Sequence, residues 1–166
     1  MKKIVGGFLA GVLVTIAFSF IQSKKDLRLS KIESETSFIT ARDAAGKEIT
    51  FKDSYTLYNR NGNPVEETEY FRDGTIKKKH TNKYNSFYDK IEEIEFDGKD
   101  GKTTKTVFNY NANGDKTSET QYNADNMVMK CIEYTYDSKG FKSTKKTLDG
   151  QKAIISIKKY QYTSFK

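Results

Sequence analysis

The sequence of 166 residues predicts an all-β protein, an antiparallel β-meander of repeated hairpins with about ten strands. The sheet is expected either to curve and stay open or to close like a barrel, and one N-terminal hydrophobic helix precedes it. Aromatic residues return at a fixed interval of 26 residues, at Tyr58, Tyr84, Tyr110, Tyr136 and Tyr162. Turn-forming pairs lie between them, at Asn61-Gly62, Asp73-Gly74, Asp97-Gly98, Asn113-Gly114, Asp125-Asn126 and Asp149-Gly150. This spacing leaves strands of roughly 7 to 10 residues between tight hairpin turns.

Residues 1–22 are expected to be a signal peptide or a membrane anchor. Lys2 and Lys3 precede an uncharged apolar run over residues 4–21, which is just long enough to cross a bilayer. The small residues of 17–19 favour cleavage, whereas the spacing of Gly7 and Gly11 favours a helix that stays in the membrane. Either outcome places the rest of the chain outside the cytoplasm, as a membrane-anchored or secreted protein.

Residues 23–31 are expected to be a short stem, and residues 32–166 a single β-hairpin repeat domain. Its five units lie near residues 32–57, 58–83, 84–109, 110–135 and 136–162. The first unit matches the repeat poorly, as terminal repeats that cap a stack often do. The segment 91–96 has helical propensity but occupies a strand position of the repeat, so we expect a strand there.

Alternation of side chains predicts one apolar face. Tyr134 and Tyr136 are separated by one polar residue, which sends both rings to the same side of a strand. We therefore expect the repeated tyrosines to be core residues, and the opposite face to be mostly solvated, as at Lys79, Thr81 and Lys83. In the last units, apolar residues also occupy the strand positions that face away from the tyrosines. We therefore expect those strands to be covered on both sides. The residues concerned are Met129, Cys131, Ile155 and Ile157.

Composition argues against several classes of function. The net charge is +7, but basic and acidic residues are interspersed, so no nucleic-acid partner is expected. One Cys and one His cannot form a disulfide or a structural zinc site with four Cys and His ligands. We assign no catalytic, cofactor-binding or metal-binding residue, expect no cofactor, and expect the protein not to be an enzyme.

Four motifs have a structural explanation that outweighs a chemical one. Residues 109–115 have the oxygen spacing of a calcium loop, but their ligands are nearly all neutral and an Asn-Gly turn explains them. The basic run 77–80 is expected to be a solvated face, with His80 on the surface. Cys131 is expected to be a packed thiol. The glutamates recur with the structural period and are expected to pair with lysines across strands: Glu66, Glu67, Glu69, Glu92, Glu93 and Glu95.

The segment Tyr134-Thr135-Tyr136-Asp137-Ser138-Lys139-Gly140-Phe141 resembles the YD repeat, also called the RHS repeat. The segments beginning at Tyr58 and Tyr110 match it with Asn in place of Asp. The resemblance extends over about residues 58–162 and implies a meander of hairpins that curls into a shell or spiral. Large members enclose toxin domains or take part in cell-surface and carbohydrate contacts, but four or five units are too few to enclose a cargo. Short repeat proteins of bacterial envelopes are also similar.

These features together predict a non-enzymatic exported or cell-envelope interaction module that binds a protein or a glycan. A membrane tether would run through residues 4–21. The alternative is a binder of a small apolar or lipid ligand, in which the aromatic face lines a cavity of the β-sheet. Exposure of the repeated tyrosines would favour the first of these functions, and an enclosed cavity would favour the second.

Overall fold

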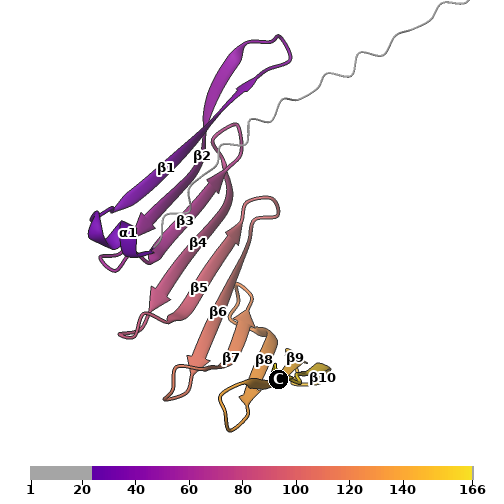
Figure 1. Cartoon of the computed structure of the whole chain (residues 1–166). Helices are drawn as coiled ribbons and strands as arrows, with labels where there is room; N and C mark the ends of the chain where they lie inside the picture. The colour runs from indigo at the N-terminus through magenta and orange to yellow at the C-terminus, as the bar shows by residue number, and fades with distance from the viewer. Residues whose placement is uncertain (1–23, 166) are drawn as a thin grey trace, which may run out of the picture.

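A computed structural model describes residues 24–165 and contains a single ten-stranded sheet in which the strands lie in chain order (Figure 1). Every strand pairs antiparallel with the next one along the chain. The predicted β-meander of ten strands is therefore confirmed. The elements are α1 (Lys24–Leu29), β1 (Ser34–Arg42), β2 (Glu48–Tyr58), β3 (Pro64–Tyr70), β4 (Ile76–Tyr84), β5 (Lys90–Asp97), β6 (Lys102–Tyr110), β7 (Lys116–Tyr122), β8 (Val128–Tyr136), β9 (Lys142–Asp149) and β10 (Ile154–Lys159).

Six of the nine hairpin turns in the described chain are built around an Asn or Asp that follows the last residue of a strand. At the β6–β7 turn, the side-chain oxygen of Asn111 accepts hydrogen bonds from the backbone N–H groups of Asn113 and Asp115, both at 2.9 Å. Gly114 has a positive φ of 83°, a backbone conformation that glycine adopts without strain. These turns are thus wider than the two-residue turns that the Asn-Gly pairs predict, because the Asn three residues before the Gly closes them.

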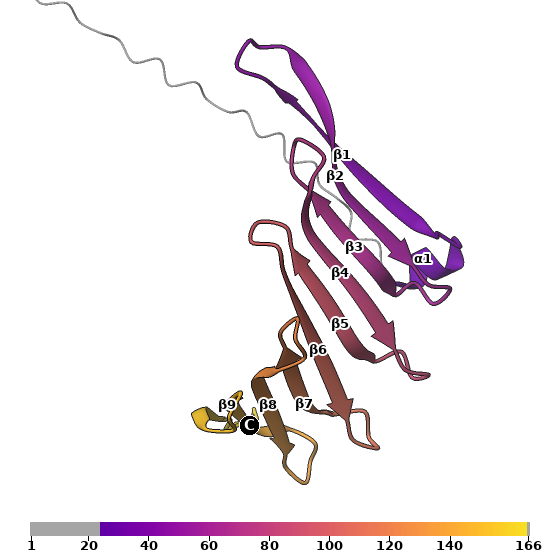
Figure 2. The same ribbon diagram turned by 180° about the vertical axis from the view of Figure 1, so that it is seen from behind.

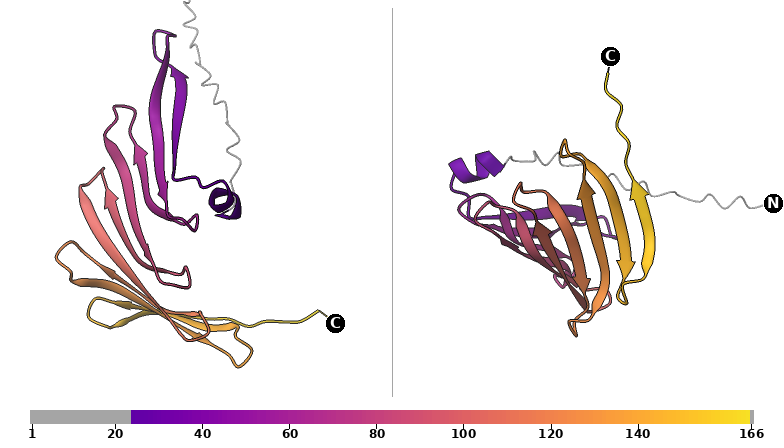
Figure 3. Two further views of the ribbon diagram at one scale, coloured as in Figure 1. Left: turned by 90° about the vertical axis from the view of Figure 1, so that its left-hand side faces the viewer. Right: turned by 90° about the horizontal axis from the view of Figure 1, so that it is seen from below.

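Register shifts recur beside these turns. In the β6–β7 pair, Tyr110 lies opposite Lys116 and Asn109 lies opposite Ser118, so Thr117 is an extra residue on β7. A bulge of this kind bends a strand and increases its twist. The sheet accordingly curves along its length, and α1 lies on the inner side of the arc (Figure 3).

The sheet is open and consists of one layer. The view from behind shows that no second layer of described residues covers it beyond the short α1 (Figure 2). Leu27, Ile132 and Leu148 are the buried hydrophobic residues of the described chain, and none of its large side chains is fully buried. The predicted single core face and the closed, barrel-like alternative are therefore wrong.

The repeated tyrosines stabilise the sheet through their hydroxyl groups. Each of four hydroxyls donates a hydrogen bond of 2.8 to 2.9 Å to a backbone carbonyl 20 residues earlier, at the start of the preceding strand. The pairs are Tyr84 with Pro64, Tyr110 with Lys90, Tyr136 with Lys116, and Tyr162 with Lys142. These rings are half-buried or exposed, so they clamp neighbouring strands together at one end of the sheet instead of filling a core.

The predicted N-terminal hydrophobic helix and the cleavage site fall in residues 1–22, which lie outside the described residues. Within 24–165, no helix is long and apolar enough to cross a membrane. The segment predicted as a stem contains α1.

Candidate functional site

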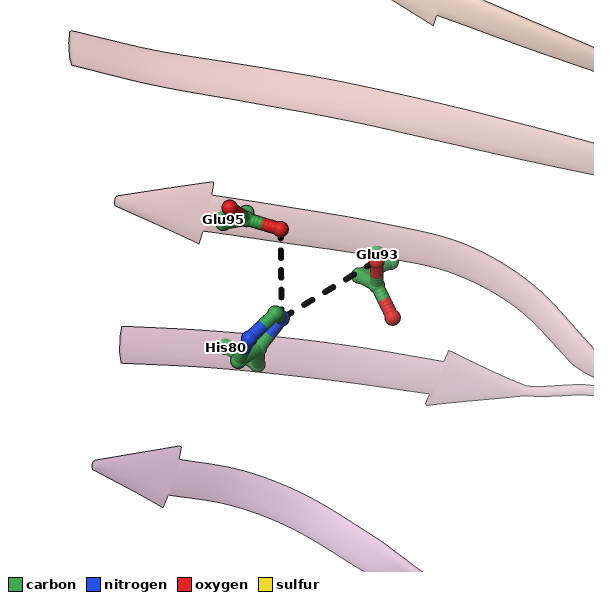
Figure 4. A group of neighbouring side chains, drawn as sticks. All are labelled: His80, Glu93 and Glu95. Atoms are coloured by element: carbon green, nitrogen blue, oxygen red, sulfur yellow. Dashed lines mark ion pairs between the residues drawn. The ribbon is translucent and has the colours of Figure 1, made fainter. Parts of the chain in front are cut away.

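The strand register brings His80, Glu93 and Glu95 together on one face of β4 and β5. His80 lies directly opposite Glu95, and Asn82 lies opposite Glu93. Because alternate residues of a strand share a face, His80 and Asn82 project from β4 on the side from which both glutamates project from β5. Figure 4 shows the imidazole on one strand facing both carboxylates on the neighbouring strand.

One nitrogen of the imidazole faces both carboxylates. His80 Nδ1 is 3.9 Å from Glu93 Oε1 and 3.8 Å from Glu95 Oε2 (Figure 4). Both distances exceed a hydrogen bond, so the three groups converge without closing on one another. The three side chains are between 24% and 32% exposed, which leaves the cluster accessible to a small ion from solvent.

The second oxygen of each carboxylate is held by a lysine. Lys78 Nζ lies 2.8 Å from Glu95 Oε1, and Lys90 Nζ lies 2.6 Å from Glu93 Oε2. These contacts fix the carboxylates so that their other oxygens turn toward His80. The predicted pairing of glutamates with lysines across strands is confirmed for Glu95 and, through Lys77, Lys79 and Lys83, for Glu69, Glu66 and Glu92. It is not confirmed for Glu93, whose lysine lies on the same strand, or for Glu67, which accepts a hydrogen bond from Asn82.

Asn82 contributes a buried polar atom beside the cluster. Its side chain is only 3% exposed, and its Nδ2 donates to the carbonyl oxygen of Pro64 at 3.0 Å and to Glu67 Oε2 at 3.1 Å. Both partners are acceptors, so the amide orientation is fixed. Both partners lie on β3, and on the other side of β4 Asn82 lies opposite Glu93. The amide oxygen of Asn82 has no hydrogen-bond partner among the described residues.

A shallow hollow on the sheet extends from this cluster toward β2. It has a volume of about 290 Å³. Its lining is mostly polar and consists of Ser54, Tyr55, Thr56, Glu67, Thr68, Glu69, His80 and Glu93. A hollow with this lining suits a small hydrated or charged ligand better than an apolar one.

The hydroxyls of Tyr84 and Tyr110 are held in the neutral, donating form. Burial, followed by the nearby charges of Glu67 and Glu93, raises the pKa of Tyr84 to about 12. Burial also raises the pKa of Tyr110, and Asp89 and Glu119 add to this shift. These hydroxyls therefore serve as hydrogen-bond donors to the backbone at neutral pH.

The remaining candidates do not join the cluster. The calcium-like segment 109–115 forms the β6–β7 turn, and Asn111 uses its side-chain oxygen on that turn's backbone. Cys131 is half-buried on β8, and its sulfur accepts a hydrogen bond from Thr120 Oγ1 at 3.6 Å. The basic run 77–80 is divided between the two faces and paired with glutamates, so it forms no free cationic patch.

A second exposed feature lies at the C-terminal end of the sheet. β10 pairs only with β9, so one of its edges carries backbone groups without a neighbouring strand. Ile155 and Ile157 on this strand are 61% and 51% exposed. The prediction that the last strands are covered on both sides is therefore wrong for the described chain, in which Met129 on β8 is also exposed.

Comparison of the sequence with protein-family models and with curated proteins gives no match. The resemblance to the YD repeat thus stays a prediction based on the motif itself.

Sequence reasoning placed His80 on the surface and did not connect it with Glu93 and Glu95. A signal was nevertheless present in the repeat. Counting 26 and 52 residues from Asn82 leads to Phe108 and Tyr134, and the same steps from His80 lead to Thr106 and Ile132. The unit that carries the cluster therefore has polar residues, Asn82 and His80, at two repeat positions where the later units have other residues, among them aromatic rings at the position of Asn82.

Proposed function

We propose that this chain is a non-enzymatic β-repeat interaction module of the cell envelope or the exterior, and that its partner is a protein that docks on the C-terminal strands. The observation that carries the proposal is the exposure of apolar side chains on β8 and β10 together with the free edge of β10. Exposed apolar surface of this kind is typical of protein contact sites.

The free edge favours a protein over a glycan. An extended peptide segment can pair with the unpaired N–H and C=O groups of an edge strand, and side chains that alternate along it contact the strand's own side chains. A glycan has no regular ladder of such groups. Lys158 and Lys159 end β10, so a partner segment with carboxylates at the matching position would add favourable charge pairing.

Export rests on the basic residues and the apolar run of residues 1–22, which would deliver the sheet to the cell surface or anchor it there. For the alternative function, the binding of a small apolar ligand, the described residues offer a hollow of about 600 Å³ beside the β6–β7 turn, with Phe87, Ile91 and Phe108 in its lining. The hollow is open to solvent and Asn and Asp side chains also line it, so it is not the enclosed cavity that this function requires.

The test is photocrosslinking in cells that produce the protein. A photoreactive amino acid is placed at Ile157 on β10 or, as a control, at the exposed Ile39 on the opposite edge strand β1. We expect a discrete protein adduct from position 157 and none from position 39. A correctly folded chain that gives no adduct at 157, or the same adducts at both positions, contradicts the proposal.

The partner identified in this way is then purified and its affinity measured. Ile157→Lys should weaken binding at least tenfold, because it places a charge in the apolar contact, whereas Ile39→Lys should leave it within about twofold. Binding to a purified glycan that survives Ile157→Lys would instead support a glycan partner.

A further inference from the structure

We propose that His80, Glu93 and Glu95 form a binding site for a divalent transition-metal ion of the zinc class, with Asn82 as a fourth oxygen donor. This site lies on β4 and β5 and is independent of the proposed protein contact at β10.

The positions of the donor atoms fit such an ion. The three potential ligand atoms lie within 4.8 Å of one another. In a tetrahedral site with bonds of about 2.0 to 2.2 Å, ligand atoms are about 3.4 Å apart. The two distances from His80 Nδ1, 3.8 and 3.9 Å, thus need only a small rotation of the side chains to close around an ion.

The chemistry of the donor set selects the class of ion. One imidazole nitrogen and two carboxylates are ligands that zinc accepts, and the amide oxygen completes four. Calcium requires six to eight oxygen ligands, and the cluster offers fewer than that. Lys78 and Lys90 hold the outer carboxylate oxygens, as outer partners orient the ligands of known metal sites.

Asn82 supplies independent support. A buried amide oxygen without a hydrogen bond destabilises a folded protein, and a bound water or ion is one way in which such an atom is satisfied. The equivalent position two units later shows what the fold would otherwise place there. Tyr134 occupies it and donates to Glu119 at 2.8 Å, just as Asn82 donates to Glu67. The second unit therefore has, in place of an aromatic ring, an amide that lies beside the cluster and whose buried oxygen has no partner among the described residues.

His80 is the single histidine of the chain, so nuclear magnetic resonance can follow the site directly. The full-length chain, purified without a histidine tag and with nitrogen-15 in the imidazole, is titrated with Zn²⁺ alone. We expect one equivalent to shift the Nδ1 resonance to the metal-bound range while Nε2 keeps its proton. No shift of Nδ1 at a threefold excess, or a shift at Nε2 instead, would overturn the proposed geometry.

Calorimetry with Zn²⁺ then tests the ligands. Glu95→Gln and Glu93→Gln should each reduce the association constant at least tenfold. Glu119→Gln is the matched control, because Glu119 occupies the position of Glu93 one unit later, and it should change binding less than twofold. Cys131→Ser should also leave binding unchanged. Equal losses in Glu95→Gln and Glu119→Gln would indicate unspecific attraction to acidic residues and refute the site.

The sharpest variant restores the repeat. Asn82→Tyr should place a ring where Tyr134 stands two units later, with its hydroxyl on Glu67. We expect the urea midpoint of unfolding to stay the same or rise, while the Zn²⁺ association constant falls at least tenfold. Wild-type Zn²⁺ affinity in a folded Asn82→Tyr chain would remove Asn82 from the site. If this variant fails to fold, Glu95→Gln decides the proposal by itself.

Discussion

Truncation of Tyr110 tests how a sheet without a packed core is held together. The Tyr110 hydroxyl donates to the carbonyl oxygen of Lys90 at 2.8 Å and so joins the end of β6 to the start of β5. Tyr110→Phe removes this one hydrogen bond and keeps the ring. A single neutral hydrogen bond contributes about 0.5 to 1.5 kcal/mol, and the half-buried Lys90 carbonyl can regain water. We therefore expect a loss of about 1 kcal/mol or less in the free energy of unfolding.

Tyr110→Ala also removes the ring. A fully buried ring would make this loss roughly 3 to 5 kcal/mol. The ring is only half-buried, so about 100 Å² of buried area is at stake, which corresponds to about 2.5 kcal/mol. Tyr110→Ala should thus lower the free energy of unfolding more than Tyr110→Phe does, but less than the removal of a fully buried ring would.

Urea unfolding at neutral pH measures both losses, provided that the slope of the transition stays constant. Tyr162→Phe is the matched control, because its hydroxyl makes the same bond to Lys142 at the exposed end of the chain. It should cost less than Tyr110→Phe, since chain ends fray. A loss above about 4 kcal/mol for Tyr110→Ala would restore the core interpretation, and no loss in either Tyr110 variant would refute the clamp.

Three further predictions follow from the turns, the tyrosines and the N-terminus. Gly98→Ala should lower the free energy of unfolding by about 2 to 3 kcal/mol, because the added Cβ would overlap the carbonyl oxygen of Ile76. In Gly74→Ala the added Cβ meets no atom, so the loss should be only about 1 kcal/mol, from the positive φ alone. Thermal melts of the two variants test the difference. Burial raises the pKa of Tyr84 to about 12, so the hydrogen bond of its neutral hydroxyl should stabilise the fold fully below pH 10 and lose this effect between pH 10 and 12. Thermal melts across this range should show the loss in the wild-type chain and not in Tyr84→Phe, which has no hydroxyl to ionise. Fractionation of cells should find the protein with membranes or outside the cytoplasm, and a cytosolic chain that retains residues 1–22 would contradict export.

Much of the fold could be predicted because the turns are local. An Asn such as Asn111 closes its turn with its own side chain, and the Gly three residues later permits the backbone conformation, so the sequence around each turn determines where strands end. The strand assignment of 91–96 is confirmed as part of β5 for the same reason. The regular period then predicts ten strands without any knowledge of distant contacts.

Burial could not be predicted in this way. Ile132 is buried, yet Ile157 is half-exposed, although a repeat pattern treats both as apolar strand residues. Burial depends on whether another layer covers the strand, and the period contains no information about a second layer. The identical alternation of side chains therefore serves equally well for a sandwich, a barrel and a single sheet.

The cluster around His80 was harder to predict because it depends on register. His80 meets Glu95 only if the β4–β5 turn has its observed length and Ile91 is the bulged residue. A slip of one residue would send the carboxylates to the other face. The replacement of a ring by Asn82 was visible in the sequence, but its significance became clear only when its amide oxygen proved to be buried without a partner.

The distribution of stabilising contacts links folding to binding in this protein. Lysine–glutamate pairs such as Lys83 with Glu92 are partly exposed, and each such pair contributes at most about 1 kcal/mol. The contact of Lys116 with the Phe108 ring, at 4.6 Å from its centroid, adds an effect of similar size. Stability is thus spread over many small interactions between neighbouring strands, and the last strand has one neighbour fewer than the others. A partner that pairs with β10 would supply that missing neighbour, and because it binds only the folded sheet, it must raise the melting temperature as its concentration rises.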